Sequence, residues 1–172
     1  MGILDNLSKL HTPEEIFSWK LGAALSMEHT VVDSLQDMQQ ETPRAEVRDL
    51  LAKHEEQSRD QIARIEQCFQ LLGEEVDDSP CPAMQGIAKE GKATLKKIDD
   101  AIVDAGILSG AIETEHHEIA VYEVLVTNAK ARGREDVADL LAQNLREEEE
   151  TLEAVKALGE RLANEGYAVA AA

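Results

Sequence analysis

Apolar residues recur every three or four positions along four long segments of this chain, which is the spacing of one face of an α-helix. The pattern predicts helices over about residues 13–40, 43–72, 99–132 and 134–163. No window alternates between apolar and polar residues for long enough to predict a β-strand. The chain is therefore expected to fold as an all-α protein.

Start and stop signals agree with these segments. Thr12 followed by Pro13 has the order of an N-cap and a first helical residue, and Thr42 followed by Pro43 repeats that signal for the second helix. Gly73 stands where the second helix should end, since glycine readily takes the left-handed conformation of a C-terminal cap. The sequence thus predicts two long helices with a short connection between them.

The lengths of the connections indicate the topology. The first and second helices, and the third and fourth, are joined by only a few residues, so each pair should form an antiparallel hairpin. Residues 74–98 form a longer crossover, whose second part, 83–97, has the pattern of a short extra helix. A crossover of this length can travel the length of the bundle and make the third helix parallel to the second. We therefore expect a single ferritin-like four-helix domain over residues 1–172.

Four glutamates interrupt the apolar faces of these helices. Glu28 lies on the stripe of the first helix, Glu115 and Glu118 on that of the third, and Glu148 on that of the fourth. A carboxylate facing a packed core is costly unless a cation or several donors neutralise it. Acids from several helices of one bundle are what a di-iron or di-manganese site requires. The alternative is that each is a boundary residue whose carboxylate reaches water.

Composition narrows the range of partners. The 172 residues include 17 basic and 35 acidic side chains, for a net charge of −18. This balance argues against nucleic acid and anionic membranes as partners, and it is compatible with the attraction of metal cations. The two cysteines are too few for a disulfide framework or a cysteine zinc site. With no signal peptide and no long apolar run, the expected location is the cytoplasm.

Four segments resemble one known family in matching order. They are the second-helix run His54–Phe69, the crossover segment Cys81–Ile87, the third-helix run Glu115–Tyr122 and the fourth-helix segment that begins at Leu145. This sequence resembles the YciE/YciF family of ferritin-like, stress-associated bacterial proteins. The resemblance implies a four-helix bundle with a di-metal carboxylate centre, and a homodimer.

Two positions depart from the family pattern. After the histidine of the second helix, the inward position by apolar spacing is Gln57, while Glu56 shares a face with Ala52, Arg59 and Ala63. Leu152 stands one turn after Glu148, where the family tends to have an acid. Glutamine can bind a metal through its carbonyl oxygen but brings no charge. The site that the resemblance implies is therefore intact, weakened, asymmetric, mononuclear or lost.

Other polar residues on these helices have competing interpretations. His54 is a candidate nitrogen ligand one turn before Gln57, or a helix histidine satisfied by a hydrogen bond. Tyr122, one turn beyond Glu118, is the candidate catalytic residue, as a hydrogen-bond donor to a carboxylate or as a redox-active neighbour. The alternative is an ordinary buried tyrosine with one hydrogen-bond partner. His117 points away from the acids and is expected to face solvent or a partner subunit.

Two functions follow as hypotheses. The first is a di-metal protein that binds Fe or Mn and reduces dioxygen or peroxide during stress, with Glu28, His54, Gln57, Glu115, Glu118 and Glu148 as metal ligands. The second is a metal-free helical bundle with a structural or interaction role. Whether the protein is an enzyme stays open at this point.

Overall fold

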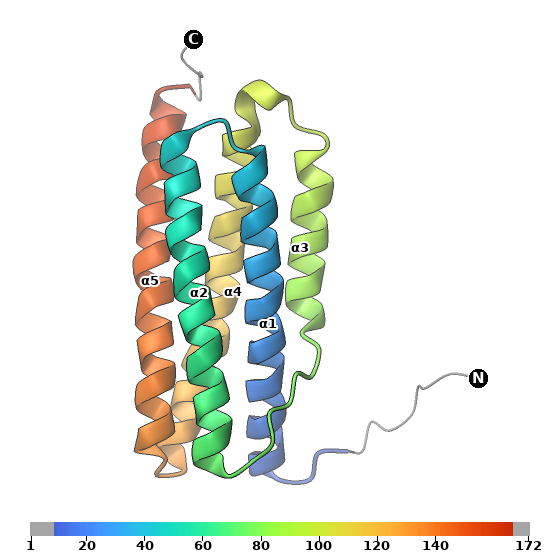
Figure 1. Cartoon of the computed structure of the whole chain (residues 1–172), viewed down its shortest axis with the longest axis vertical. Helices are drawn as coiled ribbons and strands as arrows, with labels where there is room; N and C mark the ends of the chain where they lie inside the picture. The colour runs from blue at the N-terminus through green and yellow to red at the C-terminus, as the bar shows by residue number, and fades with distance from the viewer. Residues whose placement is uncertain (1–8, 167–172) are drawn as a thin grey trace, which may run out of the picture.

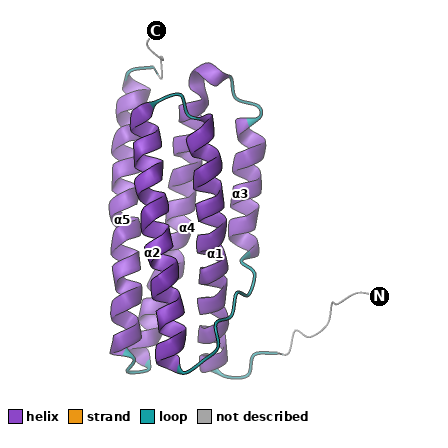
Figure 2. Cartoon of the chain, in the orientation of Figure 1, coloured by secondary structure: helices purple, strands orange, loops and turns teal. Residues whose placement is uncertain are grey.

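Four long helices form an antiparallel bundle in the computed structural model, which describes residues 9–166 (Figure 1). The long helices are α1 (Pro13–Glu41), α2 (Ala45–Leu72), α4 (Val103–Ala131) and α5 (Glu135–Asn164). A shorter helix, α3 (Pro82–Leu95), and a 3₁₀ turn, Asp100–Ile102, lie in the crossover. No strand occurs in the part of the chain that the structure describes (Figure 2). The all-α prediction is therefore confirmed.

The order of contacts around the bundle is that of the ferritin-like fold. The hairpins α1–α2 and α4–α5 pack against each other through α2–α5 and α1–α4 contacts. The crossover climbs beside α1, and α3 covers α1 and α4 on the outside (Figure 1). Because of this crossover, α4 runs parallel to α2, as the sequence predicted.

Local signals explain most helix boundaries. The Thr12 hydroxyl accepts a hydrogen bond from the Glu15 backbone, and the Glu15 side chain accepts one from the Thr12 backbone, which completes the predicted capping box. Gly73 ends α2 with a φ of 72°, a left-handed conformation that costs glycine little. Gly133 adopts the same conformation between α4 and α5.

The predicted start of the second helix is wrong by two residues. Thr42 is the C-cap of α1, and its hydroxyl donates to Asp104 at 2.5 Å and accepts from the Arg44 backbone at 3.2 Å, so it lies before the N-cap of α2. Helix α2 begins at Ala45, after Arg44, whose guanidinium lies 3.1 Å from the same Asp104. The side chain that resembles an N-cap in the sequence thus binds a buried carboxylate of another helix, Asp104 of α4.

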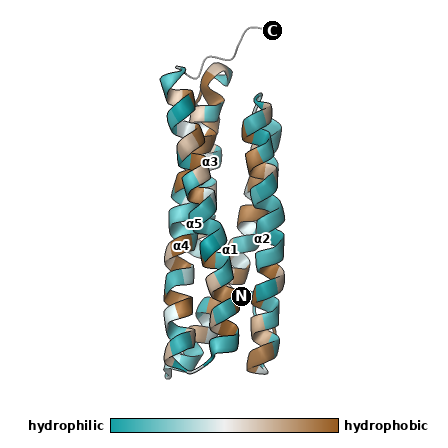
Figure 3. Cartoon of the chain, turned by 90° about the vertical axis from the view of Figure 1, so that its left-hand side faces the viewer, coloured by the Kyte–Doolittle hydropathy of each residue, from teal (hydrophilic) through white to brown (hydrophobic). Residues whose placement is uncertain are grey.

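The core runs the length of the bundle, and the outer faces are mostly hydrophilic (Figure 3). One apolar layer lies at the end where α1 and α5 begin, and it includes Phe17, Phe69, Ala129 and Val137. Gly106 of α4 lies close to the end of α3 and the turn after it, because a Cβ there would lie 3.2 Å from the Cδ2 of Leu95 and 2.3 Å from the Cδ1 of Ile98. None of the helices formed by residues 9–166 is long and apolar enough to cross a membrane.

Candidate metal centre

Acids and a histidine from three helices meet inside the bundle. His54 comes from α2, Glu115 and Glu118 from α4, and Glu148 from α5. One potential ligand atom of each residue lies within 4.8 Å of the others, and all four side chains are buried. The spacing of Glu115 and Glu118, three residues apart, puts both on one face of α4. This acid cluster, His54 with Glu115, Glu118 and Glu148, is the candidate metal centre.

The cluster contains more negative groups than donors. His54 Nδ1 lies 3.0 Å from an oxygen of Glu115, and His54 Nε2 lies 3.4 Å from Glu148 and 4.0 Å from Glu118. These are ion-pair contacts, and both oxygens of each of the three glutamates lack a well-formed hydrogen bond. Buried polar atoms are nearly always satisfied in proteins. A cation among these carboxylates could satisfy their oxygens.

The fourth acid of the sequence stripes lies beside this cluster. Glu28 on α1 is fully buried, and Tyr122 donates a hydrogen bond to its Oε1, while its Oε2 has no hydrogen-bond partner. The charge of Glu148 acts on Glu28, and that of Glu28 acts on Glu115 and Glu118. The structure therefore brings together all four glutamates that the apolar pattern singled out.

Burial and mutual repulsion keep most of these carboxyl groups neutral when no cation is present. Burial, followed by the charge of Glu148, raises the pKa of Glu115 to about 11 and raises the pKa of Glu28 and Glu118 well above the ordinary value. For Glu148 burial is the largest single effect and acts against ionisation, but His54, together with hydrogen bonds from Glu115 and Gln61, lowers the pKa on balance. The metal-free centre thus favours one carboxylate paired with His54 and protons on its neighbours.

A hydrogen-bonded chain connects Glu28 with the outer side of the bundle. Tyr122 is fully buried, and its oxygen accepts a hydrogen bond from Asn144 Nδ2 at 3.1 Å. Asn144 Oδ1 in turn accepts from Arg64 Nε at 2.5 Å, and Arg64 also donates to Glu147. Burial, then the charge of Glu28, raises the pKa of Tyr122, so its hydroxyl stays protonated and donates. Tyr122 thus lies within the core and touches a candidate ligand.

Sequence reasoning missed Asn144 and Arg64. Asn144 stands four residues before Glu148 on the buried side of α5, so a second polar residue on that stripe was the available signal. Nothing in the spacing of α2 singles out Arg64, since its place in the chain depends on how α2 packs against α5.

Gln57 occupies a different position from the one predicted. Its side chain is half-buried, and its Oε1 accepts a hydrogen bond from the Thr151 hydroxyl at 3.4 Å. The fully buried residue after His54 is Ser58, followed by Gln61. The inward face of α2 thus carries His54, Ser58, Gln61 and Ile65, so the predicted stripe is wrong only at Gln57, where Ser58 faces inward instead. Glu56 is exposed, as predicted.

Leu152 and His117 complete the set of sequence predictions. Leu152 is buried and apolar, so α5 supplies Glu148 to the centre without a second acid one turn later. His117 is half-buried, and its Nε2 lies 3.8 Å from the Sγ of Cys81 at the start of α3. The expectation that His117 faces solvent or a partner subunit is therefore wrong, because the crossover covers it. Burial lowers the pKa of His117.

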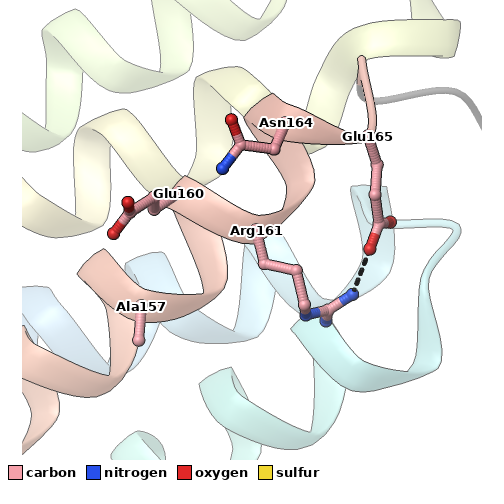
Figure 4. A pocket seen from close by; sticks show the side chains of 5 residues that line it. All are labelled: Ala157, Glu160, Arg161, Asn164 and Glu165. Atoms are coloured by element: carbon pink, nitrogen blue, oxygen red, sulfur yellow. Dashed lines mark hydrogen bonds and ion pairs between the residues drawn. The ribbon is translucent and has the colours of Figure 1, made fainter.

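One surface hollow holds no comparable chemistry. It lies at the end of α5, where Figure 4 shows Ala157, Glu160, Arg161, Asn164 and Glu165. Arg161 forms an ion pair with Glu165 at 2.9 Å, and it also pairs with Glu46 of α2. Arg161 and its two glutamate partners are exposed side chains, and the hollow has no cluster of buried metal-binding groups.

The donor set of the acid cluster fits a hard or borderline divalent cation. Three carboxylates and one imidazole suit Fe or Mn better than copper or a structural zinc. A buried His/Glu cluster of this kind could hold a metal ion, and Glu28 adds a further carboxylate beside it.

A helical bundle with a crossover and a buried carboxylate–histidine cluster defines the class of ferritin-like proteins. A family model described as a domain of unknown function, DUF892, matches residues 12–168. The chain therefore belongs to this family, the YciE/YciF family that the sequence resembles.

Known relatives agree with this assignment. Protein YciF of Escherichia coli (strain K12) is 28% identical over 144 residues, which cover 83% of this chain and 87% of YciF. The crystal structure of YciF, an E. coli stress protein, has a TM-score of 0.85 at 26% identity, covering 90% of this chain and 99% of that one. YcfI of Rhodopseudomonas palustris also has a TM-score of 0.85, at 29% identity, covering 88% of this chain and 98% of its own.

Proposed function

We propose that this protein is a ferritin-like carboxylate protein that binds two Fe or Mn ions and reduces dioxygen or peroxide. The observation that carries the proposal is the buried acid cluster, in which three glutamates from two helices have no well-formed hydrogen bond. Such a cluster costs stability unless a cation neutralises it.

Each residue of the candidate metal centre has a role that depends on its position. Glu115 and Glu118 of α4 would hold the ions together with Glu148 and His54, and Glu28 would add a carboxylate from α1. Two such ions, when bound, supply electrons for reduction of dioxygen or peroxide. Tyr122 holds Glu28 through its hydrogen bond and is a positioning residue for that carboxylate. The fully buried surroundings keep bulk water away from the acids.

Two relatives support different biological roles. YciF is described as a stress protein, which supports a role of this chain in handling iron, oxygen or peroxide under stress. YcfI is described as a putative structural protein. A metal-free structural bundle is the alternative for this chain, and the absence of a charged side chain at Gln57 and Leu152 favours it. A homodimer remains an expectation in either case.

Anaerobic Fe(II) oxidation tests the proposed reaction. Protein loaded with Fe(II) and mixed with peroxide should oxidise about two Fe(II) for each peroxide consumed, because each Fe(II) gives one electron and peroxide takes two. Glu115→Ala should abolish this reaction above the rate of free Fe(II). Glu56→Ala, an exposed glutamate of α2, is the matched control and should react as the unmodified protein does. Equal rates with and without the protein would support the structural role.

A further inference from the structure

A cavity of about 700 Å³ lies between α1, α3 and α4 and reaches the acid cluster. Its outer rim is formed by residues of all three helices, and its buried lining includes His54 and Glu115. In Figure 1, α3 stands beside α1 with α4 behind, and this is the side of the bundle where the cavity opens. The volume lies within the usual range for small-molecule pockets.

The cavity ends on polar atoms that lack partners. Glu115 is 0% exposed, and neither of its carboxylate oxygens has a well-formed hydrogen bond. His54 is 3% exposed, and its Nε2 has no hydrogen bond either. A molecule at the inner end of the cavity would therefore lie next to His54 and Glu115, two residues of the candidate metal centre. This contact distinguishes the cavity from a simple gap in packing.

The walls between the rim and these polar atoms are apolar. Val31 and Leu35 of α1, Met84 of α3, and Ile107 and Ala111 of α4 are buried and line the cavity. An apolar wall offers no hydrogen bonds to a polar molecule, but burial of hydrocarbon against it is favourable by roughly 25 cal/mol per Å². The walls therefore favour a hydrocarbon chain.

Glycines keep part of this space open. Gly110 of α4 and Gly91 of α3 line the cavity, are half-buried, and a Cβ at either position would meet no atom within 4 Å. Glycine inside a helix is less stable than alanine by roughly 0.5–1 kcal/mol. Gly106, one turn before Gly110, is different, because close packing against Ile98 requires it. The space at Gly110 is thus free for a ligand.

The charges at the rim disfavour an anionic ligand. Lys89 and Lys92 of α3 and its C-cap Lys96 lie around the opening with five acids, namely Asp33, Asp37, Glu41, Asp100 and Glu113. Lys92 and Asp37 neutralise each other in an ion pair of 2.7 Å that links α3 to α1. The remaining rim carries more acids than lysines, and the whole chain has a net charge of −18. A carboxylate or phosphate head group would be repelled.

We propose that this cavity binds an uncharged, aliphatic small molecule and holds it against the His54 and Glu115 side of the acid cluster. That the bound molecule is a substrate rests on the proposed metal function. The proposed binding of this molecule rests only on the walls, the open glycine positions and the charges of the rim.

Fluorescence of N-phenyl-1-naphthylamine, an uncharged apolar probe, tests the binding on metal-free protein. The probe should bind saturably with about one site per chain and be displaced by 1-decanol. Decanoate, of the same chain length, should compete at least tenfold less well because of its charge. Absence of saturable binding would overturn the proposal, and equal competition by decanoate would overturn its claim of an uncharged ligand.

Two matched variants place the binding in the cavity. Gly110→Leu fills the open space and should weaken probe binding at least tenfold. Gly86→Leu makes the same change at an exposed glycine of α3 that does not line the cavity, and it should leave binding unchanged. Circular dichroism and melting curves check that both variants fold. Unchanged binding in folded Gly110→Leu, or equal loss in both variants, would contradict the proposal.

Paramagnetic Mn(II) separates failure of the cavity from failure of the metal site. Protein incubated with Mn(II) should broaden the proton NMR lines of 1-decanol, and Gly110→Leu should abolish this broadening while it keeps Mn(II) binding. Probe binding without any bound Mn(II) would contradict the metal function and leave the cavity standing. Bound Mn(II) without probe binding or decanol broadening would overturn the cavity and leave the metal function standing.

Discussion

Two buried layers of this bundle are built in opposite ways. At the end where α1 and α5 begin, Phe17, Phe69 and Cys68 pack among aliphatic residues, and burial raises the pKa of the Cys68 thiol to about 12. Nearer the middle, α4 and α5 bring Glu115 and Glu148 close to each other. Both layers exclude water, but only the first gains free energy from doing so.

The difference shows that the apolar layer stabilises the fold and that the acid layer serves another purpose. Aliphatic and aromatic side chains in place of the four acids would give a more stable bundle, because buried charges rarely repay their desolvation. The apolar layer supplies the stability that lets the bundle keep the acid cluster. Substitutions in the two layers should therefore have opposite effects on the metal-free protein.

The largest expected effect comes from the apolar layer. Phe69→Ala should lower the free energy of unfolding by about 3–5 kcal/mol, since it removes a fully buried aromatic ring and leaves a cavity. Urea denaturation followed by circular dichroism measures the change. In folded Phe69→Ala, Mn(II) affinity should stay within about threefold of the unmodified protein. A large loss of affinity would mean that the two layers are coupled.

Metal should stabilise the acid layer to a similar extent. At a hundred to a thousand times the dissociation constant, Mn(II) should add roughly 3–4 kcal/mol to the free energy of unfolding. For a chain of this length that corresponds to a rise of about 6–16 °C in Tm. Anaerobic melting curves at high salt, which screens non-specific effects on the acidic surface, measure the rise. An equal rise with Mg(II) would show that the cluster has no specific affinity for Mn(II).

The stability of the metal-free protein should fall as pH rises. Glu115, with a pKa raised to about 11, and Glu28 and Glu118, also raised, keep protons in the folded state that the unfolded state releases above its ordinary glutamate pKa near 4.3. The folded state therefore binds more protons between that value and about 11, and stability declines across this window.

Glu115→Gln isolates this contribution. The variant should be more stable than the unmodified metal-free protein at pH 8, by at least about 1.4 kcal/mol, and the gain should shrink toward pH 5. Chemical denaturation at several pH values measures both trends. A gain that is independent of pH would mean that Glu115 is already ionised in the folded protein.

The smallest effect is expected at Gln57. Because its side-chain oxygen accepts a hydrogen bond from Thr151, Gln57→Ala should change Mn(II) affinity by less than threefold. Isothermal titration calorimetry compares it with Glu118→Gln, which should lose at least a hundredfold. A comparable loss of Mn(II) affinity in Gln57→Ala would support the inward position that the apolar spacing predicted for Gln57.

The fold was predictable from the sequence because its signals are local. Apolar periodicity, the capping box at Thr12 and the glycine at the end of α2 depend on neighbouring residues, and the length of the crossover restricts the topology. The same spacing placed four glutamates on inward faces. Glutamates among leucines were informative because so few burial patterns tolerate them.

The sequence predictions were wrong where tertiary contacts determine the partners and the direction of a side chain. Thr42 has the residue type of an N-cap, but its hydroxyl donates to Asp104, which is 62 residues later in the chain. On α2, a polar stretch around His54 left the inward face uncertain by one residue, so Gln57 was chosen over Ser58. The Arg64–Asn144 hydrogen bond joins helices 80 residues apart in sequence, and no local pattern encodes it.

Counting bound metal tests the central claim most directly. Protein purified without chelator, reconstituted anaerobically with Mn(II) and desalted at high salt should retain about two Mn per chain by elemental analysis. Glu115→Gln treated in parallel should retain at least one Mn fewer, and Glu56→Gln should match the unmodified protein. No retained Mn or Fe in the unmodified, folded protein would contradict the account and leave a structural bundle.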